Sequence, residues 1–355
     1  MTFFVQPDSP RVFTDGIEHP DLFLWDAWSY EQDDRLHLYC LAVERVLNNG
    51  RKLQPHERND VPFHVRHFCS SDGGESWQDL GVFQEPRPAL RSFDARTVWS
   101  SSITVLPDQR KLVAYTGLAE QGTDQPFIQS MATALSSDGE RLDADSIRLI
   151  SSPVTDWEEI TAAGYYIAER SKLGHRDGED GGPILAWRDP YVVEVEGDLH
   201  MFWCAKADRT TPALGHAKLN AEFQIDTLYP PTRLPDGTNF TQFELPKVYY
   251  DDTNKQFYLI GATCNRLYEG QSDAEVDKQI RMYVSDSVRG PWRPHSPHGS
   301  SLGLGAKHMF GMTVLRTNFT TGELLCIAPY TEAAEKPLTF SAPFTIKLNP
   351  EALDG

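Results

Sequence analysis

Short strand-like runs, separated by turn-forming residues, recur along almost the whole 355-residue chain and limit what it can fold into. These runs are rich in β-branched and aromatic residues and span 35–43, 101–105, 111–115, 190–195, 199–204, 247–250, 256–261, 280–284 and 323–327. Two pairs of them repeat one hairpin pattern, with acidic turns at 196–198 and 251–254. Only residues 160–173 predict a helix. The chain is therefore expected to be all-β.

Many short strands with few helices predict a sandwich, a barrel or a propeller. Propeller blades are four-stranded units of roughly 40–50 residues, or more with long loops. The length therefore suits a single domain over 1–355 with about five blades. One Ser-x-Asp-x-Gly-x-x-Trp stretch at 70–77, the Asp-box of sialidase-like propellers, favours the same reading. Its expected role is structural, with Asp72 bonding the turn backbone and Trp77 packing beneath it.

Composition excludes several classes of protein. A hydrophobic content of 40% with 39 aromatic residues is ample for a packed core, so the chain is not disordered. A formal charge of −18 disfavours nucleic acid and anionic membranes as partners, and it fits a small sugar or an adaptation for solubility.

The cysteines and the N-terminal residues bear on the cellular compartment in which the protein is expected. The five cysteines are odd in number and widely spaced in apolar runs, which predicts buried reduced thiols. No secretory signal and no membrane-spanning run is apparent, so we expect a cytoplasmic protein or one exported without a recognisable signal.

Three acidic residues lie in unusual local surroundings. Asp26 stands in Leu-Trp-Asp-Ala-Trp, Asp189 in Ala-Trp-Arg-Asp-Pro-Tyr and Glu244 in Phe-Glu-Leu-Pro-Lys. Carboxylates among Trp, Phe and Pro differ from ordinary solvated acids. Cleavage of a glycosidic bond requires carboxyl groups in distinct roles, so the chain is interpreted as a carbohydrate-active enzyme. Taken singly, each acid has a structural alternative, as a turn former, an ion pair with Arg188 or a strand-edge carboxylate.

Five ordered motifs resemble glycoside hydrolase family 68, the levansucrases, inulosucrases and related β-fructofuranosidases. They are Trp-Asp-Ala-Trp at 25–28, Val-Trp-Ser-Ser-Ser-Ile-Thr at 98–104 followed by Tyr-Thr-Gly at 115–117, Arg-Asp-Pro-Tyr at 188–191, Glu-Leu-Pro-Lys at 244–247 and Ser-Asp-Ser-Val-Arg-Gly-Pro-Trp at 285–292. The resemblance implies a five-bladed β-propeller with a central funnel-shaped active site.

The resemblance also implies roles for individual residues. Asp26 would be the nucleophile, Asp189 the stabiliser of the transition state and Glu244 the acid/base. Substrate contacts would come from Trp25, Trp28, Trp99, Ser100, Arg188, Gln242 and Arg266. The sequence departs from the family pattern at two positions where the leaving group would bind. Leu245 stands where the family usually has Arg, and Gln242 stands where many members have Glu.

The expected function is that of a retaining β-fructosyl enzyme that hydrolyses sucrose or a related β-fructofuranoside, or transfers its fructosyl unit. Alternatives are another five-bladed glycosidase such as an arabinofuranosidase, an inverting mechanism, or an inactive sugar-binding propeller. A sialidase would need an arginine cluster that does not stand out. No cofactor or metal is expected. The histidines, including His64 and His67, lack ligand spacing, and the acidic loop at 177–180 is interpreted as solvated.

Overall fold

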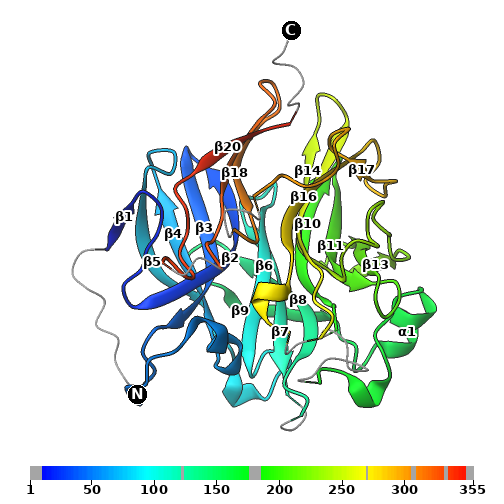
Figure 1. The fold of residues 1–355 in the computed structure, drawn as a ribbon, viewed down its shortest axis with the longest axis horizontal. Helices are drawn as coiled ribbons and strands as arrows, with labels where there is room; N and C mark the ends of the chain where they lie inside the picture. The colour runs from blue at the N-terminus through cyan, green and yellow to red at the C-terminus, as the bar shows by residue number, and fades with distance from the viewer. Residues whose placement is uncertain are drawn as a thin grey trace.

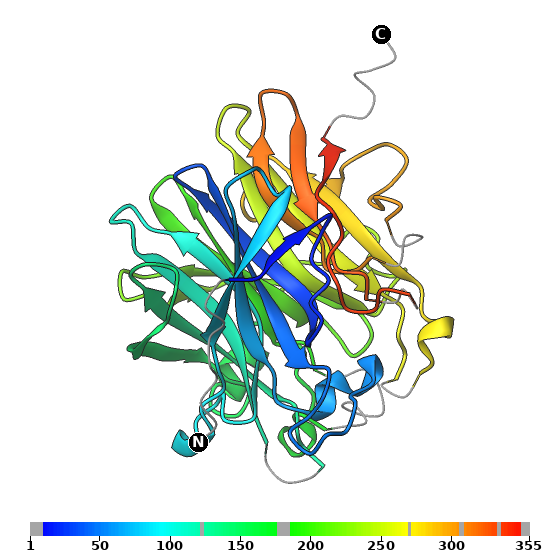
Figure 2. The same ribbon diagram turned by 90° about the vertical axis from the view of Figure 1, so that its left-hand side faces the viewer.

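The computed structural model describes residues 10–120, 124–175, 185–268, 271–304, 309–331 and 335–348. In these residues, five antiparallel sheets follow one another along the chain and stand around a common centre (Figure 1). Figure 2 shows the same arrangement with the first blade toward the viewer. The expected fold, a five-bladed β-propeller, is confirmed.

Each blade begins with its innermost strand and is extended outward by antiparallel pairing. Blade one consists of β2 (Leu22–Gln32), β3 (Arg35–Glu44), β4 (His64–Ser70) and β5 (Ser76–Gln84), with β1 (Val12–Thr14) on its outer edge. Blade two consists of β6 (Thr97–Val105), β7 (Lys111–Ala119), β8 (Ile128–Ser136) and β9 (Asp143–Ser151). Blade three consists of β10 (Arg188–Val195), β11 (Asp198–Lys206), β12 (Pro212–Leu219) and β13 (Ile225–Leu228).

Blades four and five complete the ring. Blade four consists of β14 (Gln242–Asp251), β15 (Gln256–Cys264), β16 (Lys278–Ser285) and β17 (Arg293–Pro294). Blade five consists of β18 (Thr313–Asn318), β19 (Glu323–Ile327) and β20 (Phe344–Lys347). Among the described residues the helical segments are short: η1 (Pro55–Asp60), η2 (Pro88–Leu90), α1 (Trp157–Ala162), η3 (Arg170–Lys172) and η5 (Asp273–Glu275).

The hydrophobic core is divided among the boundaries between blades. Five clusters of buried apolar side chains each draw on two neighbouring blades. Trp28 and Tyr115, for example, belong to the cluster between blades one and two, and Trp203 to the cluster between blades two and three. Each blade is therefore held by its two neighbours, because both faces of its sheet are buried against apolar surface.

The ring closes through a segment near the C-terminal end. The backbone N–H of Leu24 in β2 donates to the carbonyl of Leu338 over 2.8 Å, and Ile17 exchanges two backbone hydrogen bonds with Phe340. Ser341 in turn donates its N–H to the carbonyl of Ala328, which follows β19. Residues 338–341 thus tie blade five to the beginning of blade one.

The sequence predictions for the fold agree with the structure except at the helix. All nine strand-like runs lie in strands, and the two acidic turns join β10 to β11 and β14 to β15. In the Asp-box, Asp72 accepts a hydrogen bond from the N–H of Ser76 over 2.9 Å, and Trp77 is buried. All five cysteines are buried free thiols, as expected.

The predicted helix at 160–173 is wrong in its extent. Helix α1 covers only Trp157–Ala162, and the turn η3 follows at Arg170–Lys172. The helix ends because Gly164 takes a φ of +96°, a left-handed conformation that stops helix propagation. Beyond it, Tyr165, Ile167 and Leu173 pack in the core between blades two and three without continuing the helix.

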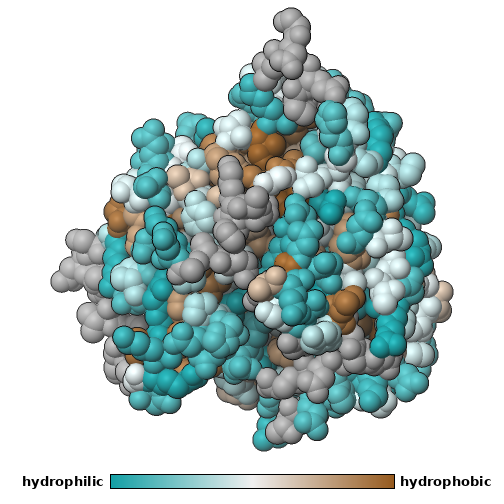
Figure 3. All heavy atoms as spheres, in the orientation of Figure 1, coloured by the Kyte–Doolittle hydropathy of each residue, from teal (hydrophilic) through white to brown (hydrophobic). Residues whose placement is uncertain are grey.

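Hydrophilic residues dominate the face of the molecule shown in Figure 3, with smaller hydrophobic areas, drawn in brown, between them. In the part of the chain that the structure describes, no helix has both the length and the apolar character needed to cross a membrane.

Two histidine pairs, buried except for the half-buried His37, lie on the second and third strands of blades one and three. His37 in β3 lies 3.0 Å from His67 in β4, and His200 in β11 lies 3.0 Å from His216 in β12, measured between ring nitrogens. Burial, with smaller effects of Arg35 and Lys111, lowers the pKa of His37 to about 4. Burial lowers the pKa of His67 to about 3, and His37 adds to the effect. Burial also lowers the pKa of His200, and it lowers the pKa of His216 to about 3. Both pairs are therefore neutral in the folded protein at neutral pH.

These pairs predict that stability falls as pH falls. Below about pH 6.5 the histidines of the unfolded chain bind protons, whereas those of the folded protein do not. Each histidine therefore lowers the free energy of unfolding by up to about 1.4 kcal/mol for each unit that the pH falls. We expect the double variant His37→Phe/His67→Phe to lose less unfolding free energy between pH 6.5 and pH 4 than the wild type. Urea unfolding at several pH values measures this difference. Substitution of the exposed His298 by Gln is the control, and an equal pH dependence in wild type and double variant would contradict the assignment.

Candidate active site

The pairing of the innermost strand is broken at a corresponding place in four of the five blades. One extra residue interrupts the register between Trp25 and Ala27, between Trp99 and Ser101, between Arg188 and Tyr191, and between Glu244 and Lys247. Such bulges re-aim side chains and are common beside active sites. All three acidic residues that the sequence singled out lie in or next to one of these breaks.

The backbone at three of the breaks is left-handed. Asp26 has a φ of 35°, Asp189 of 60° and Leu245 of 53°. Non-glycine residues in this region cost roughly 1–3 kcal/mol each, and they persist only where the surrounding structure fixes them. The backbone is therefore strained at the three residues that depart from the regular alternation of side chains along a strand.

Asp26 and Ser100 come from neighbouring blades and are bonded directly. The Ser100 hydroxyl donates to Oδ2 of Asp26 over 2.9 Å. Desolvation and the negative charge of Glu244 raise the pKa of Asp26 to about 6, while the Ser100 bond acts in the opposite direction. Gly311, with a φ of +75°, lies next to Asp26. A Cβ at this position would lie 2.7 Å from Leu245 and 3.4 Å from Asp26.

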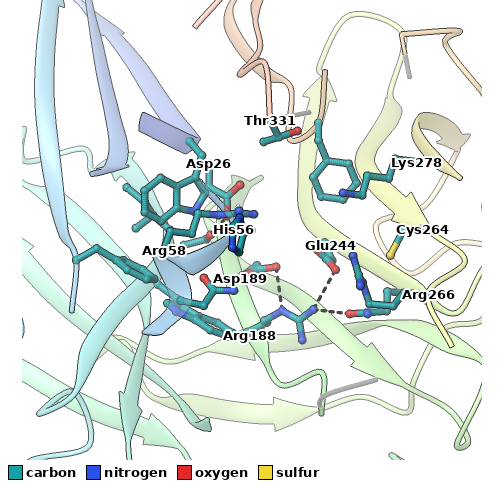
Figure 4. Close-up of a pocket in the computed structure, with 18 of the residues that line it drawn as sticks. Asp26, His56, Arg58, Arg188, Asp189, Glu244, Cys264, Arg266, Lys278 and Thr331 are labelled. Atoms are coloured by element: carbon teal, nitrogen blue, oxygen red, sulfur yellow. Dashed lines mark hydrogen bonds and ion pairs between the residues drawn. The ribbon is translucent and has the colours of Figure 1, made fainter. Parts of the chain in front are cut away.

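Arg188 links the residues of blades three and four. Its Nη1 donates to the carbonyl of Leu185 and its Nη2 to Oε1 of Gln242, both over 2.8 Å. The same Nη2 lies 3.2 Å from Oε1 of Glu244, and Nε lies 3.8 Å from Oδ2 of Asp189 (Figure 4). A fixed guanidinium of this kind holds two carboxylates in a defined arrangement.

Asp189 is the most enclosed of the three acids. Its Oδ2 accepts a hydrogen bond from the N–H of Leu245 over 3.1 Å, and its own N–H donates to the Thr116 hydroxyl over 2.9 Å. Desolvation raises the pKa of Asp189 to about 7, and nearby Glu244 and Asp26 add to the rise while Arg188 opposes it. The ionisation of Asp189 is therefore coupled to that of Asp26.

Lys247 is a functional candidate that the sequence did not reveal. It follows the break in β14 and is only 3% exposed. Burial lowers the pKa of its amine to about 8, and the charges of Asp26 and Asp189 oppose this shift. The Lys247 charge in turn lowers the pKa of Asp26. A buried cation therefore favours the ionised form of that carboxylate.

The acids surround a cavity of about 520 Å³, a size typical of small-molecule sites. Nine of the ten site residues predicted from the sequence line it: Trp25, Asp26, Trp99, Ser100, Arg188, Asp189, Gln242, Glu244 and Arg266. Trp28 is the exception. It lies two residues after Asp26 in β2, is 1% exposed and packs in the core between blades one and two, so it does not contribute to the cavity wall.

The remaining lining comes from loops and strand ends outside the motifs. These residues include His56, Arg58, Asn59, Phe63, Cys264, Gln271, Ser272, Lys278, Phe310 and Thr331. Arg58 lies on η1, and its guanidinium stands 5.7 Å from the centre of the Trp25 ring. No sequence pattern marks these positions. Strand pairing within blade four brings Cys264 and Lys278 to the cavity, and loops and the arrangement of the blades bring the others.

The described residues contain no group of three or more His, Cys, Asp or Glu side chains arranged to hold a metal ion. His64 and His67 are buried in blade one, away from the cavity wall. The acidic loop at 177–180 lies outside the described residues.

Comparison with known proteins supports the fold. No protein-family model and no curated protein matches the chain. Among solved structures, Bacillus subtilis levansucrase aligns with a TM-score of 0.65 and 16% identity over 94% of this chain and 86% of that one. A levansucrase complexed with sucrose aligns with a TM-score of 0.64 and 16% identity over 92% and 84% of the two chains. A B. megaterium levansucrase variant gives 0.62 and 15% over 92% and 83%. At this identity the likeness is one of fold.

The surroundings of Asp26 generate a prediction for Lys247→Met. Removal of the buried positive charge should raise the pKa of Asp26 above 6, by roughly one unit. Titration of the aspartate carboxyl carbons by ¹³C NMR measures this pKa directly. Lys111→Met is the matched control, since Lys111 is also buried but lies at the start of β7, where its amine bonds the carbonyl of Gln109. An unchanged Asp26 titration in Lys247→Met would exclude the electrostatic role.

Proposed function

We propose that the protein is a retaining β-fructosyl enzyme that acts on sucrose or a related β-fructofuranoside. The observation that carries the proposal is the meeting of Asp26, Asp189 and Glu244, from three different blades, around one cavity. Their electrostatic coupling and the bridging Arg188 fit a site that manages both proton transfer and a developing positive charge. The shared fold with levansucrases, including one crystallised with sucrose and one with oligosaccharides, supports a sugar substrate of this class.

In the first step, an Asp26 oxygen attacks the anomeric carbon C2 of the fructosyl unit. The bond between C2 and the leaving oxygen breaks through an oxocarbenium-like transition state, and that oxygen takes a proton from Glu244. Asp26 must be ionised to attack, and a pKa of about 6 allows this near neutral pH. Ser100 holds the attacking carboxylate in place through its hydroxyl.

In the second step, water or a sugar hydroxyl loses a proton to Glu244, and its oxygen attacks C2. The bond between C2 and Asp26 breaks, which restores both carboxyl groups to their starting states. Water as the acceptor gives hydrolysis, and a sugar hydroxyl gives fructosyl transfer. Glu244 is suited to both steps because it borders the cavity with a side chain that is 22% exposed.

Asp189 and Arg188 would act on the fructosyl hydroxyls. As positive charge develops on the ring, a carboxylate bonded to a ring hydroxyl stabilises the transition state more than the ground state. The hydrogen bond from Leu245 and the nearby Arg188 favour the ionised form of Asp189. Trp25 and Trp99 offer aromatic faces at the cavity wall, and sugar C–H groups pack well on such faces.

The experiment that tests the function is incubation with sucrose, raffinose and an arabinofuranoside, with glucose and fructose measured separately. Release of fructose from sucrose or raffinose supports the proposal, and an excess of glucose over fructose reveals transfer. Turnover of the arabinofuranoside alone would establish the alternative glycosidase. Binding of fructosides without any turnover would establish an inactive sugar-binding propeller.

The proposed roles of Asp26 and Glu244 predict different losses of activity when each residue is substituted. Asp26→Ala should abolish fructose release, because no nucleophile remains, and Glu244→Gln should reduce kcat by about 10²–10⁴-fold, as expected for loss of general acid–base catalysis. Steady-state kinetics measure both. Glu196→Gln, in the turn between β10 and β11, is the matched control and should retain wild-type activity. Fructose release by Asp26→Ala at a rate near that of the wild type would overturn the assignment.

A covalent intermediate predicts retention of configuration at C2. With methanol as acceptor, ¹H NMR of the early product should show methyl β-fructofuranoside, because two successive displacements restore the starting configuration. The α anomer as the first product would establish inversion, with Asp26 activating the acceptor in place of attacking C2.

A further inference from the structure

A polar segment borders the cavity on the side of the nucleophile. Three side chains of η1, which lies between β3 and β4, line the cavity: His56, Arg58 and Asn59. Figure 4 shows Arg58 on the same side as Asp26, with Glu244 on the opposite side. None of the five sequence motifs includes η1, so the roles assigned from the motifs leave these side chains unexplained.

The segment η1 is held at both of its ends. The backbone N–H of Gln54, just before η1, donates to Oε2 of Glu57 over 2.8 Å. Near the other end, Nη2 of Arg96 donates to the carbonyl of Asn59 over 2.8 Å. Arg58 lies between these two attachments, so its backbone has a defined place at the cavity wall.

The guanidinium of Arg58 has donors left for a ligand. An arginine side chain carries five N–H donors. Within the described part of the chain, its one hydrogen bond runs from Nη1 to the carbonyl of Pro55 over 3.0 Å, and no carboxylate forms an ion pair with it. The preceding acid, Glu57, is bound by Nη1 of Arg51 over 2.8 and 2.9 Å. The Arg58 side chain therefore has hydrogen-bonding capacity at the cavity that its neighbours do not use.

Arg58 stands close to the nucleophile. Its guanidinium lies 5.7 Å from the centre of the Trp25 ring, and Trp25 adjoins Asp26 in β2. Burial raises the pKa of Asp26 to about 6, and the positive charge of Arg58 is among the effects that oppose this rise. In the proposed reaction Asp26 attacks the fructosyl unit, and the leaving group departs from the opposite face of C2, beside Glu244. Arg58 therefore faces the fructosyl unit.

We infer that Arg58 binds the fructosyl unit of the substrate by donating hydrogen bonds to its hydroxyl groups. The inference rests on the proposed fructosyl chemistry and adds to it a substrate-binding residue from outside the motifs. A planar guanidinium can donate to two neighbouring oxygens at once, which fixes the orientation of the furanose ring toward the attacking carboxylate. The contact does not involve the leaving group, so it contributes equally to kcat/KM for different β-fructofuranosides.

The test compares the wild type and Arg58→Lys on sucrose, on raffinose, and on the four sucroses that lack one hydroxyl of the fructosyl unit, at C1, C3, C4 or C6. Lysine keeps the positive charge but loses the planar set of donors. We expect kcat/KM for sucrose to fall about 10–100-fold, and to fall by the same factor for raffinose. On the deoxy sucrose that lacks the bound hydroxyl, the two proteins should differ by less than about threefold, because the interaction is already absent.

Further variants separate hydrogen bonding from charge. Arg58→Met removes both, so it should also move the acid limb of the pH profile of kcat/KM to higher pH. The reason is that activity requires ionised Asp26, whose pKa rises when a nearby positive charge is lost. Arg58→Lys should leave this limb in place. The matched control is Arg45→Lys, since Arg45 also stands over an aromatic ring, 4.2 Å from the centre of Phe23, but does not line the cavity. It should keep wild-type kinetics.

Three results would refute the inference while leaving the proposed function intact. The first is a wild-type kcat/KM in Arg58→Lys, and the second is a loss on sucrose that disappears on raffinose, which would place the contact on the leaving group. The third is a full loss that persists on all four deoxy sucroses. Failure of the wild type to cleave any β-fructofuranoside would instead refute the proposed function, and the inference with it.

Discussion

The candidate active site depends on one extra residue in the innermost strand of each of four blades. Regular alternation in β2, β10 and β14 would direct successive side chains into the two neighbouring inter-blade cores. The extra residue breaks this alternation and points a carboxylate at the central cavity, with left-handed backbone at Asp26, Asp189 and Leu245. Packing on both faces of every blade holds these strained conformations in place.

Arg188 and Lys247 explain how three carboxylates can share so small a space. Carboxylates brought together without compensation would repel one another and retain their protons. Arg188 lies within 4 Å of both Asp189 and Glu244, and Lys247 supplies a buried charge that acts on Asp26. The remaining rise in the pKa values of Asp26 and Asp189 places their titration near neutrality, where small changes in surroundings alter the protonation state.

The sequence predicted the fold and most of the site because the information was local. Strand-like runs, hairpin turns and the motifs around Asp26, Asp189 and Glu244 are each contained in a few consecutive residues. Arg58 and Phe310 could not be predicted, since loop geometry and ring closure bring them to the cavity. Lys278 could not be predicted either, because the pairing of β15 with β16 places it there. Trp28 shares a motif with Asp26 but lies two residues further along β2, in the core, and Gly164 ends a helix that the sequence predicted to continue to residue 173.

Ring closure by residues 338–341 has a consequence for biosynthesis. All three acids lie before residue 245, yet the contacts that join blade five to Leu24 and Ile17 require the last quarter of the chain. A nascent polypeptide on the ribosome therefore carries all three acids well before it can close the ring. The candidate site is completed late in translation, after the final blade has emerged.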